Sequence, residues 1–172
     1  MEIPVATHDP DSSARRGGFE EFFRDRYEPL FRTMSLLARD RHEAEDVTQE
    51  AFSRVWERWE RVATMSGREA YLHRVAVNAF LSRRRRAAMA LRRIVAPRHE
   101  RDETARVDQV EVIMRALWTL TPRQRAAVVL LDVLDYPSKE AAAILGVRPS
   151  TVRVLASRAR AVLRERIGDD DD

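Results

Sequence analysis

Apolar residues recur every three or four positions through most of the chain, and this spacing limits the fold more than any other feature. The clearest stripe comprises Ala44, Val47, Ala51 and Val55, and it continues to Trp59. Such a repeat places one apolar face along a helix and leaves the opposite face polar. Only 5 glycines and 7 prolines occur among the 172 residues, and runs of β-branched residues are few. The sequence therefore predicts an all-α fold.

The helical spacing divides the chain into two blocks. It is lost over a stretch that is dominated by charge, as is typical of a flexible linker. We therefore expect two small helical domains joined by a flexible linker. The expected divisions are a disordered tail at 1–18, a first domain at 19–96, the linker at 97–109, a second domain at 110–167 and an acidic tail at 168–172.

Two features of the first block are expected to interrupt its helices. Pro29 lies inside an apolar repeat, where a proline is expected to kink or break the helix. The stretch 62–69 contains Gly67, the first glycine in the interior of this block, and it is expected to be a loop.

The second block carries the pattern of a helix-turn-helix. Thr121, followed by a proline, is a natural N-cap. Ser138 can cap a short helix that ends at Leu145, Gly146 makes a turn, and Pro149 opens another helix. This order predicts a helix-turn-helix, although an ordinary αα-hairpin remains an alternative. The last helix would bury Val152, Leu155, Ala159 and Val162.

The opposite face of this last helix has the composition of a DNA-reading surface. Short hydroxyls and arginines at its N-terminal turn suit the major groove, and arginine can bind guanine with two hydrogen bonds. A helix N-terminus also favours phosphate. The residues expected to contact DNA here are Arg148, Ser150, Thr151, Arg153, Val154, Ser157, Arg158 and Arg160.

Charge is distributed unevenly along the chain. The formal net charge is only +3, but eight arginines and a single acid lie between Leu81 and Arg101, and the segment 43–50 is acidic. Separate basic and acidic surfaces fit two different kinds of partner. The arginine run that ends the stretch YLHRVAVNAFLSRRRR is either an ordinary solvated face or a helix laid across a polyanion, and the charge pattern leaves both open.

Enzymes and membrane-spanning proteins are poor matches. The chain has no cysteine, and its four histidines are scattered without metal-ligand spacing. His42 begins a sequence like the zinc motif H-E-x-x-H, but Asp46 stands where the second histidine is required. No apolar run approaches the length of a membrane span. We expect no catalytic residue, metal or cofactor, no membrane insertion, and a location in a reducing cytoplasm.

Three motifs together resemble the extracytoplasmic-function group of bacterial RNA polymerase sigma factors, over about residues 19–167. The first, EDVTQEAFSRVW, is similar to the helix that docks on the clamp helices of the polymerase β′ subunit, with the family pattern D-x-x-Q-E-x-F on Asp46, Gln49, Glu50 and Phe52. The second, YLHRVAVNAFLSRRRR, is similar to the helix that melts and reads the −10 promoter element. The third, from TPRQR to RARAVL, is similar to the domain that binds the −35 element.

The first motif also has a physical interpretation. Asp46, Glu50, Ser53 and Glu57 fall on one polar face opposite the apolar stripe, with Gln49 on its flank. Spacing alone would fit an ordinary solvated face. The resemblance instead implies a polymerase-binding surface, because an acidic strip steers and aligns a basic coiled coil.

For the second motif, the resemblance implies contact with melted DNA. The loop at 62–69 would accept a flipped base, and Asn78 would read a base. Single strands need pockets and stacking groups beside a cationic track. The residues expected to contact the −10 element are Ser66, Gly67, Arg68, Arg74, Asn78, Ser82, Arg83, Arg84, Arg85 and Arg86.

The resemblance implies an alternative sigma factor with core RNA polymerase, through the β′ clamp helices and the β flap, and promoter DNA as partners. An anti-sigma factor is a further candidate partner. The stretch DYPSKEAAAIL departs from the usual start of its helix, and Val154 and Ser157 stand where many relatives have a polar and a bulky residue, which leaves the −35 preference open. The competing interpretation is a stand-alone helix-turn-helix regulator, which would not explain the acidic helix.

Overall fold

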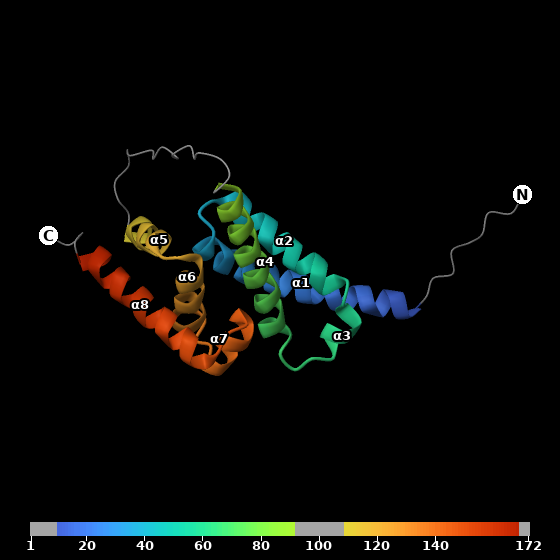
Figure 1. The fold of residues 1–172 in the computed structure, drawn as a ribbon. Coiled ribbons are helices and arrows are strands. Elements are labelled where there is room, and N and C mark those ends of the chain that lie inside the picture. Colours follow the sequence, from blue (N-terminus) through green and yellow to red (C-terminus); the bar gives the residue numbers. More distant parts are fainter. Residues whose placement is uncertain (1–9, 92–108, 169–172) are drawn as a thin grey trace, which may run out of the picture.

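The computed structural model describes the backbone of residues 10–91 and 109–168, and every regular element within these ranges is helical. This confirms the predicted all-α fold (Figure 1). Residues 97–108 of the expected linker lie outside the described residues, and the last residue of that linker, Gln109, begins α5. The elements are α1 (Pro10–Leu37), α2 (Arg41–Trp56), α3 (Trp59–Ala63), α4 (Arg68–Leu91), α5 (Gln109–Thr119), α6 (Pro122–Val128), the π-helical turn η1 (Val129–Val133), α7 (Ser138–Leu145) and α8 (Pro149–Gly168).

Helix α1 is longer than the sequence predicted. It begins at Pro10, so the stretch expected as a disordered tail at 1–18 is helical in its second half. Contacts with the rest of the domain explain this difference: Arg15 donates a 2.7 Å hydrogen bond to Glu60, and its guanidinium lies 5.2 Å from the centre of the Trp56 ring. The expected break at Pro29 is absent, because α1 continues through this residue to Leu37.

The first unit packs α1, α2 and α4 side by side (Figure 1). Helix α2 begins at the N-cap Asp40, whose side chain accepts a hydrogen bond from the Glu43 amide at 2.8 Å. The predicted stripe on α2 is buried, but the helix ends at Trp56, and Trp59 belongs to α3. The expected loop at 62–69 is shorter than predicted, since α3 extends to Ala63 and α4 begins at Arg68.

The second unit contains the predicted helix-turn-helix. Thr121 caps α6 in a capping box with Gln124, and Gly146 ends α7 with a φ of 64° in the left-handed region that favours glycine. Pro149 opens α8, as predicted. Ser138 was expected to cap α7, but it is the first helical residue, and Pro137 occupies the N-cap without a side-chain hydrogen bond.

The two units pack against each other, with α7 beside α4 (Figure 1). Arg125 on α6 is only 2% exposed, and its guanidinium donates to the carbonyls of Leu117, Leu120 and Leu37, the last of which belongs to α1. The Trp118 indole donates to the Ala38 carbonyl at 3.0 Å. A single apolar core therefore continues from one unit into the other. Among the described residues, no helix is both long enough and apolar enough to span a bilayer.

Candidate nucleic-acid and protein interfaces

A hollow of about 500 Å³ lies beside the first half of α4. Tyr71, Arg74 and Asn78 share one face of α4 there, because they are spaced by three and four residues. Asn78 is exposed, so its amide is available to donate and accept hydrogen bonds. An aromatic ring and cations beside one amide suit an unstacked base and its phosphates. The lining residues are Arg54, Glu57, Arg58, Arg61, Tyr71, Arg74, Val75 and Asn78.

Only part of the lining of this hollow was predicted from the sequence. Arg74 and Asn78 were predicted, whereas Tyr71 and the arginines contributed by α2, α3 and the turn between them were not. The spacing of Arg54, Arg58 and Arg61 was the available signal, since positions i, i+4 and i+7 fall on one side of a helix.

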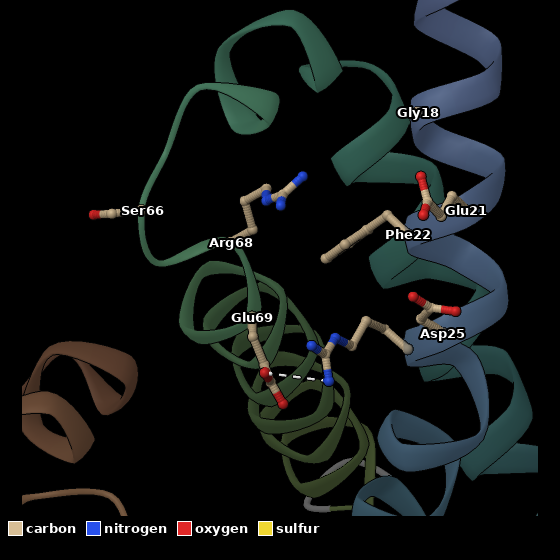
Figure 2. A pocket seen from close by; sticks show the side chains of 8 residues that line it. Gly18, Glu21, Phe22, Asp25, Ser66, Arg68 and Glu69 are labelled. Carbon is tan, nitrogen blue, oxygen red and sulfur yellow. Dashed lines mark ion pairs between the residues drawn. The ribbon is translucent and has the colours of Figure 1, made fainter.

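The predicted loop residues lie at a different hollow. Ser66 and Arg68 line a space of about 290 Å³ between α1 and the turn before α4 (Figure 2). The Arg68 guanidinium lies 5.9 Å from the centre of the Phe22 ring, and Figure 2 shows Ser66 pointing away from α1. The structure therefore does not bring these residues into the hollow that Asn78 lines. The lining residues are Gly18, Glu21, Phe22, Asp25, Arg26, Ser66, Arg68 and Glu69, of which three are carboxylates.

The arginine run on α4 meets the acidic face of α2. Arg83 donates to Glu50 Oε2 through Nε at 3.0 Å and Nη2 at 2.8 Å, and through Nη1 to Asp46 Oδ2 at 3.0 Å. Arg84 lies 2.9 Å from Glu43 in an ion pair whose angle is outside the range of a hydrogen bond. Arg85 and Arg86 are exposed. The four consecutive arginines thus fall into two that pair with α2 and two that face solvent.

The pairing changes the acidity of Arg83. Burial lowers its pKa, but the hydrogen bonds and charges of Glu50 and Asp46 outweigh burial, so that the pKa is raised above its ordinary value. Arg83 therefore stays protonated and shares its single positive charge between the two carboxylates.

The remaining residues of the polymerase motif divide between surface and core. Gln49 and Ser53 are exposed on α2 beside Asp46. Phe52, which was expected to contact polymerase, is 2% exposed, and its ring lies 4.8 Å from that of Phe23 on α1. Phe52 thus supports the surface from beneath, because its side chain is needed for the packing of α2 on α1.

Every residue that was predicted to face DNA on α8 is exposed. Val154 is an exposed apolar side chain on this face, at 49% of its full area. Arg160 differs from the others, because it donates to both carboxylate oxygens of Asp132 at 2.8 and 2.5 Å. These hydrogen bonds raise the pKa of Arg160. Arg148, Arg153 and Arg158 make no ion pair within the described part of the chain.

A buried histidine contacts a tyrosine across the boundary between the units. His73 on α4 is 4% exposed, and its Nδ1 lies 2.8 Å from the hydroxyl of Tyr136, just before α7. Burial lowers the pKa of His73 and raises that of Tyr136 to about 12. Neither residue was singled out from the sequence, because their pairing depends on how the units dock.

Two protein-family models match the chain. Sigma-70 region 2 matches residues 22–89, and Sigma-70 region 4 matches residues 111–163. An RNA polymerase sigma factor, SigM of Mycobacterium tuberculosis, is 34% identical over 157 residues, which cover 89% of this chain and 79% of that protein. The sigma-E factor of Streptomyces antibioticus is 34% identical over 156 residues, covering 89% and 86%.

Two solved structures share the fold. A sigma factor RpoE in complex with the anti-sigma factor NepR, from Bartonella quintana, gives a TM-score of 0.72 at 22% identity, covering 87% of this chain and 96% of that one. CnrH in complex with the cytosolic domain of CnrY gives 0.60 at 21% identity, covering 88% of each.

These matches define a class of transcription protein that does not itself catalyse a reaction. The chain belongs to the extracytoplasmic-function group of the sigma-70 family of RNA polymerase sigma factors. It directs RNA polymerase in promoter recognition, and its partners are core polymerase and promoter DNA. The family matches exclude the stand-alone regulator, because region 2 is present together with region 4.

Proposed function

We propose that the polar face of α2, formed by the exposed Asp46, Gln49 and Ser53 and the half-buried Glu50, docks on the β′ clamp helices of core polymerase. Its acidic character supports this assignment, because carboxylates complement a basic partner surface and steer its approach. Asp46 has the most accessible carboxylate of the set, with 63% of its side chain exposed. The second unit would bind the β flap.

We infer that the hollow beside Asn78 holds a melted base of the −10 element. The observation that carries this inference is the exposed Asn78 amide in a hollow that also contains Tyr71 and four arginines. A base taken out of the stack loses a few kcal/mol of stacking and pairing, which a complementary pocket can offset. The loop residues Ser66, Gly67 and Arg68 would contact the strand from the other side of the turn.

The exposed face of α8 would read the −35 element as a duplex. Arg153 and Arg158 are proposed to reach base edges, with Ser150, Thr151, Val154 and Ser157 beside them, and Arg148 and Arg160 to contact phosphates. Arg160 would have to exchange Asp132 for a phosphate.

Base reading by Asn78 can be tested with permanganate footprinting of the holoenzyme on a duplex promoter and on a pre-melted one. We expect Asn78→Ala to leave the affinity of the closed complex nearly unchanged, because phosphate contacts dominate it. The variant should open the duplex more slowly or change the preferred −10 sequence. If Asn78→Ala opens and discriminates promoters like the wild type, the base-reading role belongs elsewhere.

The polymerase surface can be tested separately. Replacing Asp46 and Glu50 by arginine should abolish co-elution with core polymerase while leaving helicity intact. Co-elution at physiological salt would contradict the assignment. An anti-sigma factor is a further proposed partner, because the sigma factor RpoE of Bartonella quintana, which shares the fold, was solved in complex with an anti-sigma factor. We also propose a cytoplasmic location, because the protein acts together with core polymerase.

A further inference from the structure

We propose that Arg83 is exchanged between the polymerase-binding carboxylates and a promoter phosphate, so that binding of core polymerase makes this arginine available to DNA. In the free protein Asp46 and Glu50 hold Arg83. This inference rests on the proposed function of the α2 face, and it adds that the two binding events are coupled through one side chain.

The geometry assigns Arg83 to both surfaces. Its guanidinium uses all three nitrogens on Glu50 and Asp46, so no nitrogen is without a carboxylate partner. Arg85 and Arg86 follow on the same helix and are exposed. A phosphate that approaches this run can therefore reach two cations at once, whereas Arg83 must first leave its carboxylates.

The pair is exposed enough to exchange. Arg83 retains 31% of its side-chain exposure and Asp46 retains 63%, whereas Glu50 retains 23%. Ion pairs in contact with water are weak, because solvent screens the charges and the side chains lose freedom. Glu50 would not be left without a counter-charge, since its other oxygen lies 2.5 Å from Arg54.

Arg84 provides the contrast within the same run. Its partner Glu43 is only 16% exposed, and its guanidinium lies 5.7 Å from the centre of the Phe80 ring, a core residue. Arg84 itself is 28% exposed, close to the 31% of Arg83, but among the described residues it has no partner as exposed as Asp46, and its pairing joins α2 to α4. We assign it a structural role and not an exchange.

The exchange follows from charge complementarity. Basic residues of the polymerase that bind Asp46 and Glu50 replace Arg83 as the counter-charge, and Arg83 can then bind a phosphate. By thermodynamic linkage, polymerase increases the affinity of Arg83 for DNA by some factor, and DNA that binds Arg83 increases the affinity of Asp46 and Glu50 for polymerase by the same factor. Because the exchanged ion pair is weak, the coupling factor should be about fivefold or less.

The salt dependence of DNA binding tests this proposal, because each phosphate contact adds about 0.9 to the slope of log affinity against log salt. The slopes of Arg83→Gln and of the matched control Arg85→Gln would be measured on duplex promoter DNA, at low ionic strength for the free protein and at higher salt for the holoenzyme. For the free protein, only Arg85→Gln should reduce the slope. For the holoenzyme, both variants should reduce it by about 0.9.

Two more variants fix the direction of the coupling. Asp46→Asn with Glu50→Gln should raise the slope of the free protein by about 0.9 while weakening core binding. Arg83→Lys keeps the charge and should keep the holoenzyme slope. Circular dichroism on each variant would verify that the helices remain.

Different failures have different meanings. If Arg83→Gln reduces the slope of the free protein as much as Arg85→Gln does, Arg83 is already on phosphate and the exchange is wrong. If Arg83→Gln weakens core binding and leaves the holoenzyme slope unchanged, Arg83 only orients the carboxylates, and the exchange is again wrong. If the double variant of Asp46 and Glu50 binds core polymerase like the wild type, it is the proposed function of α2 that fails.

Discussion

The hollow beside α4 and the exposed face of α8 both present arginines, but they differ in shape and in charge. The hollow is concave, and Glu57 stands among its arginines beside the amide of Asn78. The outer face of α8 is an exposed helix surface, and residues 148–158 contain no carboxylate. A concave site fits one unstacked base, whereas an exposed helix fits the major groove of a duplex. The same residue type therefore serves two kinds of DNA contact, and the backbone around it determines which.

The largest effect on stability is expected from a substitution at the contact that joins the two units. Arg125→Ala would leave the carbonyls of Leu117, Leu120 and Leu37 without their donor and would open a cavity. We expect the free energy of unfolding to fall by on the order of 3–5 kcal/mol. Urea denaturation followed by tryptophan fluorescence would measure this loss.

The control for Arg125 lies on the same helix. Arg123 is exposed, and Arg123→Ala should change the free energy of unfolding by less than about 0.5 kcal/mol. Equal losses for the two variants would mean that the buried guanidinium does not stabilise the contact. The pKa of Arg125 is lowered to about 10 by burial and then by the charges of Arg39 and Arg84, but the group stays charged near neutral pH.

The difference in shape also predicts that the face of α8 binds duplex DNA, whereas the hollow binds melted DNA. Arg153→Ala should cost roughly 1–3 kcal/mol of binding free energy on a duplex −35 site and should relax the preference at one base pair. Pre-melting the −10 element should not restore this loss, because α8 acts on the duplex. Affinities of the holoenzyme for a set of single-base promoter variants would test it, and equal losses on every variant would indicate a phosphate contact instead.

The sequence predicted those features that depend on neighbours along the chain. The Thr121 cap, the Gly146 turn and the exposed face of α8 all arise within a few residues, so periodicity and turn chemistry suffice. Side-chain pairs between distant segments were not predictable. The contact of His73 with Tyr136 joins residues 63 apart, and that of Arg83 with Glu50 joins residues 33 apart. Such pairs depend on how the helices pack, which a local pattern does not specify.

The contact between the units should also depend on pH through His73. Burial lowers the pKa of His73, the charge of Glu69 raises it, and that of Arg26 lowers it, with a net lowering below 6.5. The unfolded chain then binds more protons than the packed form as the pH falls below about 6.5, so the packed form loses stability there and is unaffected at higher pH.

Urea denaturation between pH 5 and pH 8 would measure this dependence. The loss should be smaller than that of Arg125→Ala. His73→Gln should remove the dependence assigned to this group, while the exposed His42 offers a control in His42→Gln, which should keep it. A His73→Gln protein that loses stability toward low pH as steeply as the wild type would contradict the assignment.

The smallest expected effect concerns Val154, an apolar side chain among the arginines and hydroxyls of α8. Contact with the methyl group of a thymine is the interaction that an apolar side chain can make in the major groove. One buried carbon is worth about 0.8 kcal/mol, which is roughly fourfold in affinity.

Replacing individual thymines of a selected −35 site by uracil removes only that methyl group. Wild-type holoenzyme should lose affinity at one such position, and Val154→Ala should lose the same amount on thymine and nothing further on uracil. Val133→Ala removes a valine that is 54% exposed outside α8 and should leave the uracil effect intact. If every uracil substitution acts equally on the wild type and on Val154→Ala, Val154 reads no methyl group, and the α8 surface discriminates bases through its polar side chains alone.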